Sequence, residues 1–530
     1  MAITSVSFLL FAAAILLGYY LLPKKIRWCY LLAGSMFFYL MAGIEYLAFI
    51  LITAATTYLT GLWMGQNFCK QDTFLAENKA TLSRDEKKAY KAKVKAKNRV
   101  VLIACVVVNF AVLALCKFLL VDPFMSMAKG TPLSFLSLGL PLGISFYMFQ
   151  SVGYTVDVYR GTDKAEKNPL KFLLFVSFFP QLIQGPISKH SELAPQLTAG
   201  KSFDGKEFSF GLQRMLWGFF KKMVIADRIA VAVIALRGPE YTGVGFFLLT
   251  LFYAVQIYAD FTGGIDMTIG LSQALGIKLT ENFVRPFFSK NIAEYWRRWH
   301  ISLGEWMKSY IFYPISVSQP MLKLSKSARS KLGNFGKRLP VYVASIATWL
   351  VTGIWHGITP NFVLWGMMNC FVIVVSEELN PLYEKFHNRL GWKGKWWYSG
   401  FEILRMFILM NLIRIVDLFP DVGVYFSRMG SMFTTFNFHI LWDGTMTTVQ
   451  KDGPTLILGL KALDYGILLG GIVLMFCVSL YQEKKGSIRE ALWGRPIIRY
   501  ILVFVLLAIV LLMGSYGIGY NASSFIYNRF

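Results

Sequence analysis

The sequence predicts an all-α protein that crosses a membrane many times, and three observations support this prediction. Hydrophobic residues make up 55% and charged residues only 16% of the 530 residues, whereas a typical soluble domain has about 25% charged residues. Apolar runs of about 20 residues, the length that a helix needs to cross a bilayer, recur along the chain. The basic residues behind the formal charge of +24 lie mostly between these runs, as in cytoplasmic loops rather than in a surface that binds nucleic acid.

The first part of the chain contains five predicted spans. Residues 3–22 have no basic segment before them and no small-residue cleavage site after them, so we expect a membrane helix rather than a removable signal peptide. Further spans are expected at residues 28–42, 46–65, 100–121 and 138–158, the last two joined by an outer turn at 122–132.

A strongly basic loop separates the third span from the fourth. Residues 66–99 contain ten Lys or Arg and four acidic residues, so the positive-inside rule places this loop in the cytoplasm. Residues 83–97 begin with acidic and continue with basic residues, an order that favours a helix because it complements the helix dipole. This helix is either solvated or a contact for anionic lipid or a partner.

Polar residues interrupt the apolar segments in the middle of the chain. Residues 170–186 form a short run broken by two prolines and a glycine, so we expect a re-entrant segment or a half-helix. Gln181 and Gln184 share one face of it, where they either join helices through hydrogen bonds or line a cavity.

The next segment combines basic and acidic residues with apolar ones. Residues 211–236 have an apolar face interrupted by charges, which is typical of an interfacial helix, at least at the start of the segment. A span at residues 244–260 then runs into a stretch that contains Asp260 and Asp266. These carboxylates either pair with basic residues of the following segment or face water.

The second half of the chain contains a further basic region and five more spans. Residues 278–338 contain twelve Lys or Arg, three acidic residues and frequent aromatics, which suits helices at the inner interface. The loop at 420–459 has two basic and three acidic residues and is expected outside, whereas 483–495 is expected inside. The remaining spans are expected at residues 341–355, 361–380, 401–419, 462–481 and 496–514. About eleven spans result, with both termini outside the cytoplasm.

His356 is the leading candidate for the chemical centre. It ends the apolar run at residues 341–355, and an ionisable residue inside a membrane is a functional-site hypothesis by default. Gly353, Gly357 and Pro360 surround it and can break the helix, which is tolerated where the backbone is buried or lines a cavity. A straight helix over this run places His356 about 24 Å from its inner end, past the midplane of a core about 30 Å thick.

Few other residues offer catalytic chemistry. The chain has five histidines and six cysteines, with no HExxH, P-loop or G-x-S-x-G pattern and no metal-ligand spacing. We therefore expect no metal site and no disulfide. A neutral His356 can accept a proton from a hydroxyl that attacks an activated acyl group, or serve as a hydrogen-bonding or transport residue. His300, in the sequence WRRWH, either orients a donor or is an interfacial histidine.

Several stretches together resemble the membrane-bound O-acyltransferase (MBOAT) family, in its alginate O-acetylation branch, which is related to proteins that transfer D-alanine. The most specific is ENFVRPFFSKNIAEYWRRWHISLGEWMKSYIFYP at residues 281–314. The others are FFPQLIQGPI at 178–187, QIYADFTGGIDMTIGLSQALGI at 256–277, WHG at 355–357 and SSFIY at 523–527. The sequence departs from the branch at Thr262, where serine is usual, and at residues 411–414, where an aromatic-rich stretch usually ends in Arg.

The resemblance implies a single membrane domain in which a ring of tilted helices surrounds a central tunnel. Residues 1–530 would form it, with N-terminal spans at 1–65, the basic loop at 66–99, a catalytic core at 100–380 and C-terminal spans at 381–530. The resemblance makes His356 the presumed base and places His300 on the inner side of the tunnel. It assigns tunnel-lining or scaffolding roles to Gln181, Gln184, Tyr258, Asp260, Asp266, Glu281, Asn282, Arg297, Arg298, Trp299 and Trp355.

The function implied is the transfer of an acyl group, with acetyl favoured, from a cytoplasmic thioester to an extracytoplasmic hydroxyl. His300, Arg297 and Arg298 would hold or gate the donor, since guanidinium groups suit its phosphates. No bound cofactor is expected, and the co-substrate would be acetyl-CoA or an acyl carrier. The expected partners are an esterase-like extracytoplasmic protein and a cell-surface polysaccharide, in a bacterial cytoplasmic membrane. The alternatives are D-alanyl transfer to teichoic acid from a carrier protein, a transporter, and a scaffold of an export complex.

Overall fold

The computed structural model describes residues 2–118, 141–448 and 455–516, which are mostly helical. The predicted outer turn at 122–132 and the motif at 523–527 lie outside these residues. The chain divides into two compact units, which are described separately. The first comprises Met1–Leu212 and Thr268–Thr280, and the second comprises Gln213–Met267 and Glu281–Phe530.

The first unit contains the predicted N-terminal spans. Its elements are α1 (Val6–Leu21), η1 (Lys24–Ile26), α2 (Arg27–Leu40), η2 (Ile44–Tyr46), α3 (Leu47–Glu77), α4 (Arg84–Phe118), α6 (Ile144–Arg160), α7 (Pro169–Ser177), α8 (Phe179–Gln184), α9 (His190–Thr198) and the start of α10 (Gly205–Phe219).

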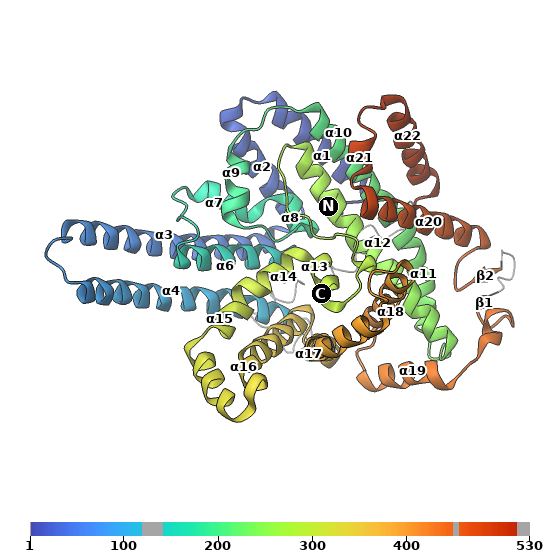
Figure 1. Cartoon of the computed structure of the whole chain (residues 1–530). Coiled ribbons are helices and arrows are strands. Elements are labelled where there is room, and N and C mark those ends of the chain that lie inside the picture. The colour runs from blue at the N-terminus through green and yellow to red at the C-terminus, as the bar shows by residue number, and fades with distance from the viewer. Residues whose placement is uncertain (1, 119–140, 449–454, 517–530) are drawn as a thin grey trace, which may run out of the picture. The chain divides into compact units, whose positions relative to one another are not determined.

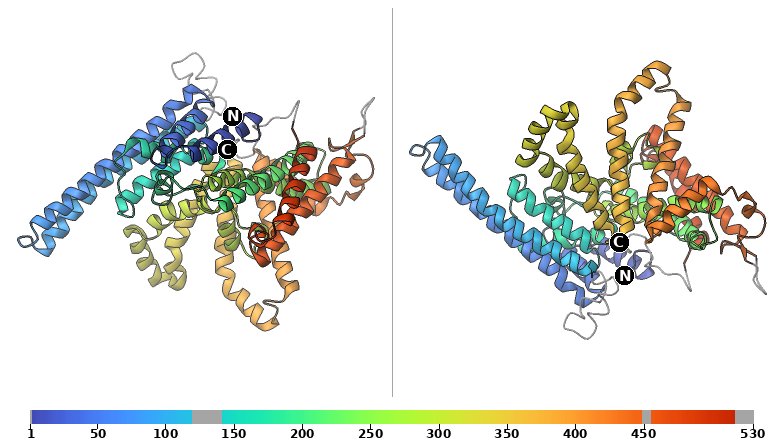
Figure 2. Two further views of the ribbon diagram at one scale, coloured as in Figure 1. Left: turned by 90° about the horizontal axis from the view of Figure 1, so that it is seen from above. Right: turned by 90° about the horizontal axis from the view of Figure 1, so that it is seen from below.

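The basic loop at 66–99 consists mainly of helix. Helices α3 and α4 lie side by side as a long antiparallel hairpin (Figures 1 and 2), and only a short turn joins them. The Ser83 backbone N–H donates to the Glu86 side chain at 2.8 Å, and the Glu86 N–H donates to the Ser83 hydroxyl at 3.2 Å. This reciprocal capping box satisfies N–H groups that have no partner within the helix, so the predicted helix at 83–97 is confirmed.

The break predicted in the segment at 170–186 is confirmed, because the segment forms two short helices, whereas its re-entry into the membrane stays a prediction. Helix α7 ends at Ser177 and α8 starts at Phe179, with Phe178 between them in a non-helical conformation. Pro180 occupies the first turn of α8, where its missing N–H costs nothing because that group has no helical partner.

The second unit contains the remaining helices and a small hairpin of strands. Its elements are the end of α10, the π-helical turn η4 (Phe220–Ala226), α11 (Asp227–Leu236), α12 (Val244–Ala274), η5 (Pro286–Phe288), α13 (Ile292–Arg298), α14 (Ile301–Met307), η6 (Lys308–Phe312), α15 (Tyr313–Ser316), α16 (Gln319–His356), α17 (Pro360–Leu390), α18 (Trp396–Arg414), η7 (Ile415–Leu418), α19 (Val422–Thr434), η8 (Phe438–Leu441), β1 (Thr447–Thr448), β2 (Leu456–Ile457), α20 (Ala462–Lys485), α21 (Ile488–Ala491) and α22 (Pro496–Met513). The antiparallel strands β1 and β2, within the loop at 420–459, were not predicted.

Seven helices in the described part of the chain are long and apolar enough to cross a membrane, so this is a multi-pass membrane protein. They are Ile44–Glu77, Arg84–Lys117, Val244–Ala274, Gln319–His356, Pro360–Leu390, Ala462–Lys485 and Pro496–Met513. Helix α1 is apolar but shorter, and α2, α6 and α18, which cover three more of the predicted spans, are shorter or more polar. The count of about eleven spans stays a prediction.

Helix α16 differs from the predicted span at 341–355. It starts at Gln319 and bends sharply at Gly333, whose φ of 55° lies in the left-handed region that glycine tolerates. Gly336 then lies directly against the backbone of Ala328, where a Cβ would collide. The two arms of α16 therefore fold back on each other, a reversal that the apolar pattern did not indicate.

The break predicted around His356 is confirmed, but it lies at Gly357, which follows the end of α16 in an extended conformation, and not at Gly353. Helix α16 continues through Gly353 to His356, and the chain re-enters a helix at Pro360. Helices α16 and α17 pack side by side (Figure 1), and a Cβ at Gly353 would lie 2.5 Å from the Phe362 carbonyl oxygen. Gly353 therefore serves the close approach of the two helices, not a break.

Candidate active site

His356 ends α16 and lies in an aromatic pocket. Its side chain is buried, and its ring centroid lies 4.7 Å from that of Trp355 and 4.7 Å from that of Trp365. The ring of Phe362 stacks at 6.3 Å. Two of these rings belong to α17, so the tight packing of α16 on α17 encloses the imidazole. The structure thus buries His356 inside the protein, whereas its depth in the membrane and its catalytic role stay predictions.

His300 lies between α13 and α14 in a backbone conformation that is uncommon for a non-glycine residue. Its φ and ψ are 47° and 54°, which costs free energy and persists only where the surroundings enforce it. The enforcement comes from Asn282, whose backbone oxygen accepts the N–H of Ile301 at 3.0 Å. The Asn282 side-chain oxygen accepts the N–H and the hydroxyl of Ser302, both at 3.0 Å.

These contacts determine the tautomer of His300. The atom of Asn282 that faces the Ser302 N–H must be the carbonyl oxygen, because a backbone N–H can only donate. His300 Nδ1 lies 3.2 Å from the same oxygen and must therefore carry a hydrogen. In neutral His300 the lone pair is then on Nε2. Burial, together with the positive charge of Arg414, lowers the pKa of His300 to about 3, so the ring is neutral near pH 7.

We expect acid to destabilise the wild-type protein more than His300→Gln. The unfolded chain binds a proton at His300 near pH 6.5, whereas the folded protein does so only near pH 3. The stability contributed by neutral His300 is therefore complete above pH 6.5 and falls by about 1.4 kcal/mol per pH unit below it. Melting temperatures in detergent at pH 7.5, 5.5 and 4.5 measure the difference. His439→Gln, at an exposed histidine, is the control, and parallel pH profiles for wild type and His300→Gln would contradict the burial of a neutral ring.

Trp355 and Arg414 connect the surroundings of the two histidines. The Trp355 ring centroid lies 6.4 Å from that of His300, besides its contact with His356. The guanidinium carbon of Arg414 lies 4.3 Å from the ring centroid of Trp299 and 6.0 Å from that of Trp365. The two histidines, 56 positions apart in the sequence, therefore share one buried aromatic cluster with a fixed cation.

Asp260 and Asp266 do not join this cluster. Lys222 Nζ lies 2.6 Å from Asp260 and 2.8 Å from Asp227, and Lys221 Nζ lies 2.6 Å from Asp266. Both lysines are at most 4% exposed. Around these lysines the segment at 211–236 is not interfacial, because carboxylates of α11 and α12, instead of water or lipid, match their charges. The carboxylates do pair with bases, but with those of the preceding segment.

Other predicted residues lie in ionic networks or around a separate pocket. Glu281 receives both terminal nitrogens of Arg214 at 2.6 Å. Arg298 lies 2.7 Å from Glu294 and 2.9 Å from Glu483, whereas Arg297 is exposed. Tyr258, Asp266 and Glu281 line a pocket that does not include either histidine. The proposed donor-holding role of Arg297 and Arg298 stays a prediction.

The contacts of Thr262 explain why threonine can stand where the resembling branch usually has serine. Its hydroxyl accepts from Lys221 Nζ at 2.7 Å and donates to the Tyr258 carbonyl at 2.6 Å. A serine hydroxyl has the same hydrogen-bonding capacity, so the substitution preserves both contacts.

In the first unit the two predicted glutamines, Gln181 and Gln184, differ in their hydrogen bonds. Gln181 donates to the Pro186 carbonyl at 2.9 Å and to the Ser188 hydroxyl at 2.6 Å, so it stabilises the turn after α8. Gln184 is 1% exposed, and neither of its side-chain polar atoms has a hydrogen-bond partner among the described residues. Such groups usually have a partner, so the cavity-lining interpretation is favoured more for Gln184 than for Gln181, of which only Oε1 lacks one among the described residues.

A model described as the MBOAT, membrane-bound O-acyltransferase family matches residues 163–416, which include both histidines and Arg414. The probable alginate O-acetylase AlgI of Pseudomonas syringae pv. tomato is 32% identical over 388 residues, covering 72% of this chain and 67% of the relative. The chain belongs to the membrane-bound O-acyltransferase family. It is therefore an O-acyltransferase.

Two further relatives are named for different substrates. The peptidoglycan O-acetyltransferase of Helicobacter pylori is 28% identical over 440 residues, covering 76% of this chain and 73% of the relative. The teichoic acid D-alanyltransferase of Bacillus subtilis is 28% identical over 258 residues, covering 47% and 61% respectively. The MBOAT family thus includes relatives of this chain that are named for different acyl groups and acceptors.

The sequence analysis did not identify Arg414 and Trp365 as members of the aromatic cluster around His300 and His356. Arg414 stood out only as the end of a stretch that departs from the branch, and Trp365 belongs to an apolar run. Both are less than 5% exposed. A signal was available in the sequence, because an arginine inside a predicted membrane span, such as Arg414 in the span at 401–419, is rarely buried without a partner.

Proposed function

We propose that this enzyme transfers an acetyl group from a cytoplasmic thioester to an extracytoplasmic hydroxyl, for the O-acetylation of a cell-surface or secreted polysaccharide. The observation that carries the proposal is the pair of buried histidines that both contact the ring of Trp355, within the part of the chain that matches the family. Relatives named as alginate O-acetylase and peptidoglycan O-acetyltransferase support acetyl as the acyl group.

In the proposed mechanism His356 is the general base. Its neutral ring accepts the proton of the acceptor hydroxyl as the oxygen attacks the thioester carbonyl carbon. The new C–O bond forms, the C–S bond breaks, and the proton passes from the imidazolium to the departing thiolate. His300, with a lone pair on Nε2, accepts a hydrogen bond from the donor and thereby positions it. The aromatic cluster excludes water, which would otherwise hydrolyse the thioester.

The proposal includes the family architecture around this site. About eleven tilted helices form a ring around a tunnel, and the remaining residues of the predicted set line or support it. The protein lies in a bacterial cytoplasmic membrane with both termini outside, and the domain layout is that expected from the sequence. The direct acceptor is an esterase-like extracytoplasmic partner or the polysaccharide itself.

The choice of donor tests the proposal. Proteoliposomes that contain the full chain are supplied with labelled acetyl-CoA or with a carrier protein loaded with labelled D-alanine. We expect release of labelled acetyl above empty liposomes and no release of D-alanine. Release of D-alanine alone would support the alternative suggested by the Bacillus subtilis relative. Uptake of a labelled substrate without cleavage of the thioester would support a transporter.

A further inference from the structure

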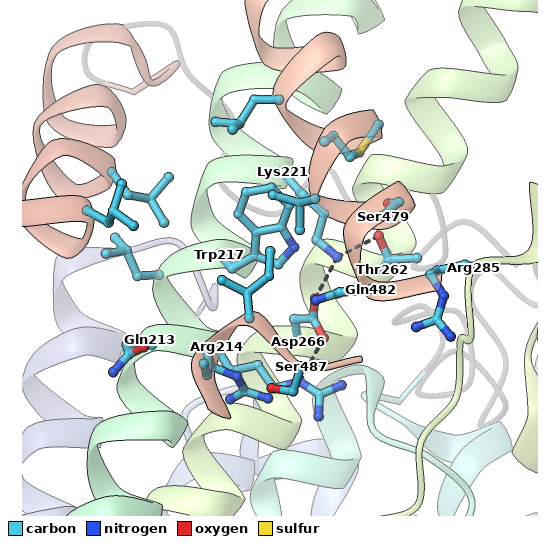
Figure 3. Close-up of a pocket in the computed structure, with 18 of the residues that line it drawn as sticks. Gln213, Arg214, Trp217, Lys221, Thr262, Asp266, Arg285, Ser479, Gln482 and Ser487 are labelled. Carbon is cyan, nitrogen blue, oxygen red and sulfur yellow. Dashed lines mark hydrogen bonds and ion pairs between the residues drawn. The ribbon is translucent and has the colours of Figure 1, made fainter. Parts of the chain in front are cut away.

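The pocket lined by Tyr258, Asp266 and Glu281 is a cavity of the second unit that lies apart from the histidine cluster. It has a volume of about 660 Å³ and is lined by α10, η4, α12, residues 281–285, α20, α22 and the segment between the last two helices. Figure 3 shows its polar residues, among them Arg214, Asp266 and Ser487, gathered on one side and apolar side chains on the other. Neither histidine lines it. Its size is within the range of small-ligand sites.

The polar side of this cavity has an excess of positive charge. The lining includes two carboxylates, Asp266 and Glu281, and five cations. Glu483, which bonds Arg285 at 2.5 Å, reduces the excess of three positive charges to two. The lining cations are Arg214, Lys221, Arg285, Arg489 and Arg499. The excess favours an anionic ligand.

Arg499 identifies where the anion would bind. It is 8% exposed, and its guanidinium carbon lies 4.4 Å from the ring centroid of Trp493. One terminal nitrogen donates to the Trp493 carbonyl at 3.4 Å, but Nε has no acceptor among the described residues. A buried guanidinium N–H without an acceptor is costly, and phosphate oxygens suit the geometry of this group.

The apolar side of the cavity is formed by two helices that are long and apolar enough to cross a membrane, α20 and α22. Leu502, Val505, Leu506 and Ile509 of α22 line it at the spacing of one helix face. Leu502 and Val505 are about half exposed, and α22 is long and apolar enough to cross a membrane, so this wall suits contact with lipid. From α20 the lining residues are Leu474, Met475, Val478, Ser479 and Gln482. A ligand with a charged end and an acyl chain matches this order of polar and apolar residues.

We propose that the cavity binds an anionic phospholipid, with its phosphate at Arg499 and Arg489 and one acyl chain between α20 and α22. Basic pockets between membrane helices are suited to such head groups. The segment at 483–495, expected in the cytoplasm, places the lipid in the inner leaflet. The second chain stays in the bilayer, beyond the exposed wall of α22. This proposal is independent of the acyl donor and acceptor.

Lipid binding to the delipidated full chain in a neutral detergent tests the proposal. Phosphatidylglycerol, phosphatidylcholine with the same chains, and inorganic phosphate each compete with a fluorescent phosphatidylglycerol. We expect wild type to bind phosphatidylglycerol at least tenfold more tightly than phosphatidylcholine, and Arg499→Gln to remove this preference. Leu506→Trp, which fills the apolar side, should weaken both lipids at least tenfold. Arg329→Gln, at an exposed arginine of α16, should change neither.

Three results would overturn the proposal. The first is equal binding of the two lipids to wild type, and the second is unchanged binding in both cavity variants. The third is competition by inorganic phosphate as strong as that by the lipid, which would assign the site to a free anion. Melting temperatures of each variant separate loss of binding from loss of folding. If Arg499→Gln fails to fold, the lipid binding of Leu506→Trp tests the proposal in its place.

Discussion

Replacing His356 with alanine or with glutamine is expected to lower acyl transfer by about 100-fold to 10,000-fold, the usual contribution of a general base. Alanine removes the ring that packs against Trp355 and Trp365 and leaves a cavity. Glutamine fills much of that space and can still form hydrogen bonds, but it cannot take up a proton near pH 7. The two substitutions therefore separate a base from a residue that only orients the substrate.

The measurement is release of labelled acetyl in membranes, at matched expression and melting temperature. His439→Ala is the control, because its side chain is exposed in the loop at 420–459. Wild-type activity in His356→Gln together with inactivity in His356→Ala would assign an orienting role. Activity retained in both would remove His356 from the mechanism.

Replacing Lys222 with methionine is expected to destabilise the protein by about 3–5 kcal/mol, the usual cost of breaking a buried ion pair. The Lys222 side chain is fully buried and lies within 2.8 Å of both Asp260 and Asp227. Its loss leaves two buried carboxylates without this cation. The free energy of unfolding in mixed detergent measures the effect, and Lys91→Met, at an exposed lysine of α4, is the control.

A triple variant that also removes the two carboxylates tests whether the loss of stability comes from unpaired charge. Lys222→Met combined with Asp260→Asn and Asp227→Asn removes all three charges, and neutral replacements of buried ion pairs are often tolerated. We expect it to recover most of the stability lost in Lys222→Met. A single variant as stable as wild type, or a triple variant less stable than the single one, would show that the charges of this cluster are not what stabilises α11 and α12.

Local features of the fold could be predicted from the sequence because their causes are local. The capping box of Ser83 and Glu86 lies within four residues, and the break before α8 follows from Pro180. Apolar runs and basic loops identified the multi-pass membrane class. The apolar run also singled out His356, since an ionisable residue in such a run is a functional-site hypothesis by default.

Features that depend on long-range packing could not be predicted. The partner of Asp260 lies 38 positions earlier in the sequence, and nothing in the apolar pattern distinguishes pairing there from exposure to water. The reversal of α16 depends on a single glycine conformation at Gly333. Arg414 joins the histidine cluster only because α18 ends beside Trp299, which residue types alone do not indicate.

The side on which the acetyl group leaves the protein tests the central claim most directly. Sealed inverted vesicles receive labelled acetyl-CoA outside, at the cytoplasmic face, and hold the hydroxyl acceptor inside. The account predicts that label accumulates on the enclosed acceptor with wild type and not with His356→Gln. Label found only on acceptor added outside, or equal label inside with both proteins, would contradict transfer across the membrane at His356.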